Sequence, residues 1–158
     1  MARDLRFAAM AHSIIVSREY EIIRHLNHHD SSIADHSVAV AYYSYKVAMV
    51  LRLRKRLPEL IRGALLHDFF FYDWRIERPR SGRLHGFDHP QEAFENALHV
   101  YGDITTIERD IILRHMWPLT LVPPRYYESM IVSLVDKVVS LGESWNTIKA
   151  GKGLGVLK

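Results

Sequence analysis

The chain has no cysteine among its 158 residues. Without thiols it cannot form a disulfide, a thiolate zinc site, an iron–sulfur cluster or a cysteine nucleophile. It also has no uninterrupted apolar run near the roughly 18 residues of a membrane helix, and its first residues lack the apolar core of a signal peptide. These absences predict a soluble, cytoplasmic protein with no membrane partner.

A strong charge of one sign is also missing. The formal net charge is +3 with neutral histidines, and the basic residues do not form the dense stripe typical of nucleic-acid-binding proteins. We therefore expect no nucleic-acid partner and favour a small anionic molecule. A composition of 48% hydrophobic and 25% charged residues is typical of one globular domain at this length.

Apolar residues recur at helical spacing along most of the chain, and no segment alternates as a half-buried strand does. The expected helices span residues 4–28 (in one or two pieces), 33–54, 58–70, 90–101, 104–116 and 125–141. Asp103 is the expected N-cap of the helix that starts at residue 104. In the helix over 33–54 the residues expected to face the core are His36, Val40, Tyr43, Val47 and Val50. The predicted fold class is all-α.

Polar residues interrupt the apolar faces of four predicted helices. These residues are His36, His67, Asp68, His115 and Asp136, and His89 lies where a further helix begins. One buried histidine or aspartate is ordinary and is usually satisfied by a hydrogen bond. Five are hard to satisfy separately, whereas one shared divalent cation can bind imidazole nitrogen and carboxylate oxygen together. The pattern favours a metal site.

The order of these residues resembles that of the HD superfamily of metal-dependent phosphohydrolases. Residues 35–40 (Asp-His-Ser-Val-Ala-Val) resemble its first helix motif, residues 63–68 (Gly-Ala-Leu-Leu-His-Asp) its His-Asp motif, and residues 134–137 (Leu-Val-Asp-Lys) its last motif. The resemblance implies a single-domain helical bundle with a metal site at its centre. The implied division is an N-terminal helical segment over 1–29 that packs on the core, an HD domain over 30–142 and a C-terminal tail over 143–158.

The resemblance also implies a role for each polar residue, because His89 and His115 are similar to the extra ligands of the two-metal branch. One ion would be held by His36, His67, Asp68 and Asp136, and a second by Asp68, His89 and His115. Asp68 and His67 would then be the residues closest to the chemistry. Such ligands suit one or two divalent transition-metal ions, namely iron, manganese, cobalt, nickel or zinc. A metal-bridging hydroxide would attack a phosphate ester or anhydride.

The chain departs from the two-metal phosphodiesterases of this superfamily in three places. Aromatic residues 69–72 follow the His-Asp pair where those enzymes usually carry a lysine, and the Gly-Tyr-Pro signature of cyclic-di-GMP enzymes is absent. A single histidine, His115 after Arg114, stands where paired histidines are common. These differences argue against a cyclic dinucleotide and leave the substrate as a nucleotide or another small phosphorylated metabolite.

Four arginines lie in the predicted loop between the His-Asp pair and His89. They are Arg75, Arg78, Arg80 and Arg83. Arginine binds phosphate bidentately, so we expect one or two of them to hold the substrate. For any single one, a solvated loop charge is an equal alternative.

Two other functions and one partner stay open at this point. Some HD-fold proteins use two irons to activate oxygen, and the same ligands would serve that chemistry. A catalytically silent, metal-binding regulatory protein could also be built on this fold, although a complete ligand set counts against it. A homodimer is open as well, because exposed and interfacial aromatic residues look alike in a sequence.

Overall fold

The computed structural model of the protein describes residues 5–28, 31–72 and 85–149, and these residues confirm the all-α prediction. The helices are α1 (Leu5–Ile15), α2 (Arg18–Arg24), α3 (Ile33–Val50), α4 (Leu57–Leu66), α5 (His85–Tyr101), α6 (Thr106–Arg114) and α7 (Tyr127–Lys149). Two short strands, β1 (Asn27–His28) and β2 (Ser31–Ser32), pair antiparallel between α2 and α3. Among the described helices, no segment combines the length and apolar character that crossing a bilayer requires.

Local capping signals determine where the helices begin. The hydroxyl of Ser17 accepts a hydrogen bond from the backbone of Tyr20 at the start of α2, and Ser32 caps α3 in the same way. At α6 the cap is Thr105, which forms a capping box with Glu108. The Thr105 hydroxyl accepts from the backbone N–H of Glu108, and the Glu108 carboxylate accepts from the backbone N–H of Thr105. Thr105, and not Asp103 as the sequence suggested, is therefore the cap.

Several helix ends differ from the sequence prediction. Helix α3 ends at Val50 rather than near residue 54, because Arg52 takes a left-handed backbone conformation with φ of 59°. Helix α4 stops at Leu66, so the His-Asp pair follows the helix instead of lying inside it. Helix α5 begins at His85 and contains Pro90, and α7 continues to Lys149. Helix α7 thus extends well past residue 141.

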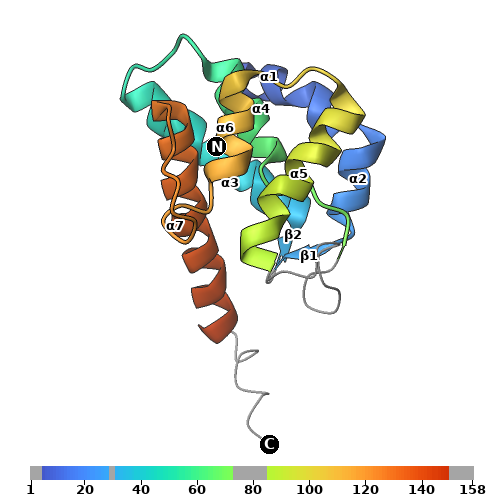
Figure 1. The fold of residues 1–158 in the computed structure, drawn as a ribbon. Coiled ribbons are helices and arrows are strands. Elements are labelled where there is room, and N and C mark those ends of the chain that lie inside the picture. Colours follow the sequence, from blue (N-terminus) through green and yellow to red (C-terminus); the bar gives the residue numbers. More distant parts are fainter. Residues whose placement is uncertain (1–4, 29–30, 73–84, 150–158) are drawn as a thin grey trace, which may run out of the picture.

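Helix α4 lies at the centre of the fold, and seven of its ten residues are buried. It packs on α3 and α6, and α7 packs on both of these helices. Helix α1 packs on α4, α2 covers part of α3, and α5 lies against α6. In Figure 1 the C-terminal turns of α7 project beyond the other helices. The four central helices are therefore α3, α4, α6 and α7, and the His-Asp pair lies at the C-terminal end of α4.

The predicted core face of α3 is only half right. His36 and Val40 are buried, but Tyr43, Val47 and Val50 are exposed. The residues that face the core instead are Ser37, Ala41, Ser44, Tyr45 and Ala48. Most of these side chains are small, which lets α3 pack closely on α4, its most extensive partner. Both sets have helical spacing, so periodicity alone cannot choose between them.

Gly63 marks a close approach of α4 and α6. A Cβ atom at this position would lie 2.6 Å from Cδ1 and 3.1 Å from Cβ of Ile111. Gly63 lies one turn before His67, and Ile111 one turn before His115. The close contact therefore brings the two histidines together, with ring centroids 4.8 Å apart.

We expect Gly63→Ala to destabilise the protein. Overpacking of a core costs about 1–3 kcal/mol, and alanine recovers at most about 1 kcal/mol through its better helix propensity. Urea unfolding should thus show a lower free energy of unfolding. The double variant Gly63→Ala/Ile111→Val, which removes the nearest atom, should unfold at higher urea than Gly63→Ala alone. An unchanged or higher stability of Gly63→Ala would contradict the close contact.

Candidate metal centre

The structure brings all six predicted metal ligands together, from five different segments. His36 comes from the first turn of α3, and His67 and Asp68 directly follow α4. The other three are His89 in α5, His115 at the C-terminal cap of α6, and Asp136 in α7. All six side chains are buried. Residues that lie up to 100 positions apart in the chain thus form one polar cluster inside an apolar core.

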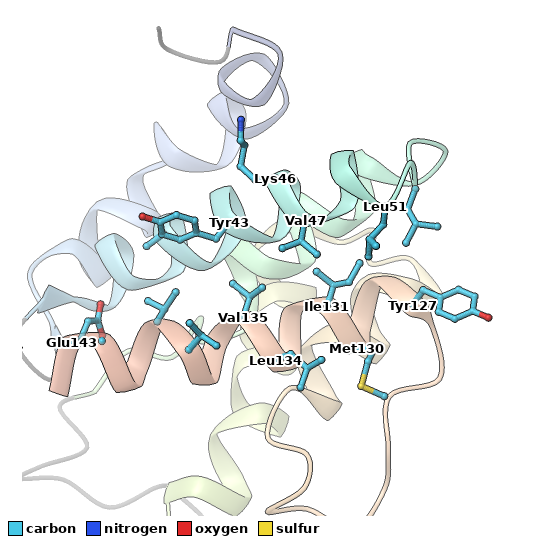
Figure 2. A pocket seen from close by; sticks show the side chains of 15 residues that line it. Tyr43, Lys46, Val47, Leu51, Tyr127, Met130, Ile131, Leu134, Val135 and Glu143 are labelled. Carbon is cyan, nitrogen blue, oxygen red and sulfur yellow. The ribbon is translucent and has the colours of Figure 1, made fainter. Parts of the chain in front are cut away.

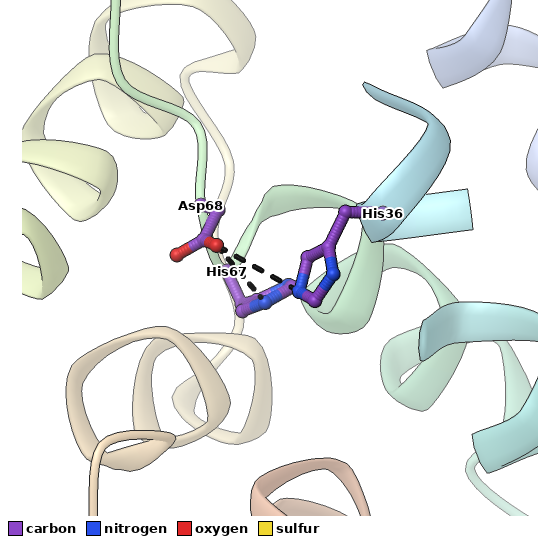
Figure 3. A group of neighbouring side chains, drawn as sticks. All are labelled: His36, His67 and Asp68. Atoms are coloured by element: carbon purple, nitrogen blue, oxygen red, sulfur yellow. Dashed lines mark ion pairs between the residues drawn. The ribbon is translucent and has the colours of Figure 1, made fainter. Parts of the chain in front are cut away.

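Asp68 lies between two pairs of imidazoles, and each of its oxygens faces one pair. Its Oδ2 lies 3.4 Å from Nε2 of His67 and 4.0 Å from Nε2 of His36. Its Oδ1 lies 3.2 Å from Nε2 of His89 and 3.4 Å from Nε2 of His115. Figure 3 shows the first of these pairs, with both histidines directed at the carboxylate. A carboxylate placed in this way is suited to bridge two cations.

Two groups of three residues could each hold a metal ion, and they share Asp68. In the group of His36, His67 and Asp68, and in the group of Asp68, His89 and His115, the potential ligand atoms all lie within 4.8 Å of one another. Asp136 belongs to neither group. Its Oδ1 nevertheless lies 3.1 Å from Nε2 of His36 and 3.7 Å from Nε2 of His67, next to the first group.

Backbone carbonyls hold two of the imidazoles in the orientation that a metal ligand requires. Nδ1 of His67 donates to the carbonyl of Ala64 at 2.7 Å, and Nδ1 of His115 donates to that of Ile112 at 2.8 Å. A carbonyl can only accept, so Nδ1 carries the proton and the neutral ring has its lone pair on Nε2. Both Nε2 atoms are thereby directed into the cluster.

His67 provides the test of whether a cation fits. Its buried Nε2 makes no hydrogen bond within the described part of the chain, although carboxylate oxygens of Asp68 and Asp136 lie within 3.7 Å. A neutral imidazole would direct its lone pair at these negative oxygens, which is unfavourable in a buried site. Either a proton or a metal ion must lie there. Imidazole and carboxylate are suitable ligands for a divalent transition metal, so the donor set fits such an ion.

The electrostatics of the cluster agree with a requirement for positive charge. Burial alone would raise the pKa of Asp68, yet the nearby imidazoles hold it well below its usual value. Burial would lower the pKa of His36, but hydrogen bonds with Asp136 and Glu143 raise it to about 10. The pKa of Asp136 is likewise lowered, despite its burial, by its hydrogen bond with His36 and by the nearby imidazole of His67. The carboxylates therefore stay charged, and protons on imidazoles balance them when no metal ion does.

His89 and His115 approach each other closely enough to need either a shared proton or a cation. Their Nε2 atoms lie 2.8 Å apart. Burial lowers the pKa of His115 and keeps its ring neutral, so His89 must donate to it. A metal ion that took the lone pairs of both rings would replace this single hydrogen bond with two ligand bonds.

Glu143 is a site residue that the sequence analysis missed. Its Oε2 accepts a hydrogen bond from Nδ1 of His36 at 3.1 Å, while Nε2 of the same ring faces Asp136 at 3.1 Å. A carboxylate behind a ligand histidine fixes the orientation of the ring and raises its basicity. Glu143 lies seven residues, or two turns, after Asp136 on α7. That spacing is the one signal that would have identified it.

We expect Glu143→Gln to weaken metal binding by roughly 10- to 100-fold, because outer carboxylates of this kind contribute about that much to affinity. Titration of the apo-protein with a metal ion, in competition with a chelating dye, measures the change. The matched control is Glu95→Gln, an exposed glutamate on α5 that pairs with Gln91. Equal affinities for the two variants would show that Glu143 does not position His36.

A second support that the sequence analysis missed holds the end of α6 against α7. Nζ of Lys137 and Oγ of Ser133 both donate to the carbonyl of His115, each at 2.8 Å. Ser133 also donates to the carbonyl of Trp117 at 3.1 Å. Lys137 directly follows Asp136 in the sequence. The same turn of α7 therefore carries the candidate ligand Asp136 and holds the candidate ligand His115 in place through its carbonyl.

The four arginines predicted to bind the substrate, Arg75, Arg78, Arg80 and Arg83, lie outside the described residues.

Comparisons of the chain with protein-family models, with curated proteins and with solved structures find no match.

Proposed function

We propose that this protein is a metal-dependent hydrolase of phosphate ester or anhydride bonds, of the HD type, that acts on a nucleotide or another small phosphorylated metabolite. The observation that carries the proposal is the position of Asp68, with one oxygen facing His36 and His67 and the other facing His89 and His115. This arrangement supports a site for two ions with a shared carboxylate. Such two-ion sites recur in phosphatases and nucleases.

The residues divide into two proposed ligand sets. One ion would be held by His36, His67, Asp68 and Asp136, and the other by Asp68, His89 and His115. When bound, divalent ions would neutralise the carboxylates, polarise phosphoryl oxygens and lower the pKa of a coordinated water. Asp68, whose low pKa keeps it ionised, supplies the charge common to both sets. Nδ1 of His67, fixed by the carbonyl of Ala64, keeps Nε2 available as a ligand.

Four arginines between the His-Asp pair and His89 in the sequence favour a phosphate group in the substrate. Arg75, Arg78, Arg80 and Arg83 lie between Tyr72 and α5. Tyr72 precedes that segment, and α5, which carries the candidate ligand His89, follows it. The Phe70 ring packs on the rings of both Tyr72 and His89, so the two ends of the segment lie near the site. Arginines tethered in this way could bind the phosphates that do not react.

The test is elemental analysis of the purified protein, followed by measurement of phosphate release. Near two equivalents of metal per chain, with chelator-sensitive hydrolysis of nucleotides or dinucleoside polyphosphates, are expected. Two irons with substrate-dependent oxygen consumption and no phosphate release would indicate an oxygenase instead. Metal uptake with neither phosphate release nor oxygen consumption would favour a regulatory protein, and no metal uptake, even from added manganese, cobalt, nickel or zinc, would overturn the proposal.

A further inference from the structure

Helix α7 is apolar on two sides, although only one of them faces the core. Its core side buries Val132, and Val135 and Val139 pack against the core beside it. On its outer side Leu134 is 51% exposed, Val138 69% and Leu141 70%. A helix at the surface of a globular protein normally carries polar residues on its outer side, and a helix that is apolar all round is normally buried. The outer side of α7 therefore has the character of an interface.

The exposed residues of α7 follow a heptad pattern. They are Tyr127, Leu134, Val138, Leu141 and Trp145, with steps of seven, four, three and four residues. This spacing places them in one narrow stripe along the helix, as in the seam of a coiled coil. A stripe of this kind packs best against another helix.

Helix α3 widens the stripe into a continuous apolar face. Between α3 and α7 lies a groove of about 920 Å³, and its exposed lining includes Tyr43 and Val47 from α3, Leu51 directly after it, and Tyr127, Leu134 and Val138 from α7. Figure 2 shows these two helices side by side with their side chains along the groove. We call the surface formed by this groove and the exposed stripe of α7 the α3–α7 face. Tyr43 and Val47, which the sequence analysis placed in the core, belong to this face.

We propose that a second copy of this chain covers the α3–α7 face. Its side chains, most of them half exposed or more, give it on the order of the 800 Å² per partner that a stable dimer buries. Homodimer interfaces are also the more apolar ones. The charged residues that line the groove are Lys46 and Glu143. Glu143 already pairs with His36 inside the chain, so Lys46 is the charged residue that this largely apolar groove presents, and a two-fold axis would set the stripe of one α7 against that of its partner.

The test is the mass of the full chain in solution, measured by sedimentation equilibrium. The wild type should have twice the chain mass of 18.4 kDa. The variant Leu134→Lys/Val138→Lys changes exposed positions and should keep its circular dichroism spectrum while its dimer dissociation constant rises by roughly 100-fold or more. Leu98→Lys is the matched control, because Leu98 is exposed on α5 outside this face, and it should stay dimeric.

Two results would overturn the proposal. A dimer that survives Leu134→Lys/Val138→Lys unchanged would have its interface elsewhere. A monomeric wild type would show that no second copy covers the face, and a loss of stability in the lysine variant would then point to the chain's own residues 150–158 as the cover. Neither result bears on metal content, so the dimer and the proposed hydrolase can fail separately.

Discussion

Replacing Asp68 by asparagine is expected to remove all bound metal and all hydrolysis. Asparagine keeps the size of the side chain but loses the charge that both imidazole pairs face. Neither ion would then keep its shared ligand, so metal content should fall to background. The Lewis acidity of the ions is worth several kcal/mol of transition-state stabilisation, so kcat/KM should fall at least about a thousandfold.

The control for this variant is Asp35→Asn. Asp35 directly precedes His36 on α3, but its side chain is exposed and accepts a hydrogen bond from the hydroxyl of Ser32. This control should keep full metal content and activity. Elemental analysis and phosphate release measure both variants, and circular dichroism checks that both fold. Metal content in Asp68→Asn equal to that of the control would refute the bridging role.

The convergence of five of the six polar residues was predictable because each one interrupts an apolar face of a predicted helix, whereas His89 was included only through the resemblance to the HD superfamily. His36, His115 and Asp136 take positions where periodicity requires a core residue, and a buried polar group needs a partner. The packing of four helices around α4 then brings these residues to one point. Which oxygen of Asp68 faces which histidines is set by helix packing, and no sequence pattern contains that information.

Two features of the fold were not predictable from periodicity, for different physical reasons. On α3, the stripe of Tyr43 and Val47 is at least as apolar as the stripe of small residues that faces α4, so hydrophobicity alone cannot identify the buried side. On α7, Glu143 follows Gly142, and glycine is a common signal for the end of a helix. The helix continues to Lys149 nonetheless, and Glu143 is thereby carried to His36. A residue such as Glu143, which positions a ligand, does not interrupt an apolar helical face. Periodicity therefore does not reveal it.

Replacing His89 by alanine is expected to remove one metal ion and leave the other. His89 faces Oδ1 of Asp68, at 3.2 Å, and contacts His115 at 2.8 Å. His36 and His67 face the other oxygen and keep their own supports from Glu143 and Ala64. Metal content should therefore fall from about two equivalents per chain to about one, and hydrolysis that needs both ions should be lost.

The control for His89→Ala is His99→Ala, because His99 lies on the same helix, α5, with its side chain exposed. This variant should keep two equivalents. If His89→Ala lost both ions, the two sites would be strictly interdependent, and the hydrogen-bonded supports of His36 and His67 would be too weak to hold an ion with Asp68 and Asp136 alone. If it kept the full wild-type content, His89 would not be a ligand. The outcome thus distinguishes two separable sites that share one carboxylate from a single site that needs every ligand at once.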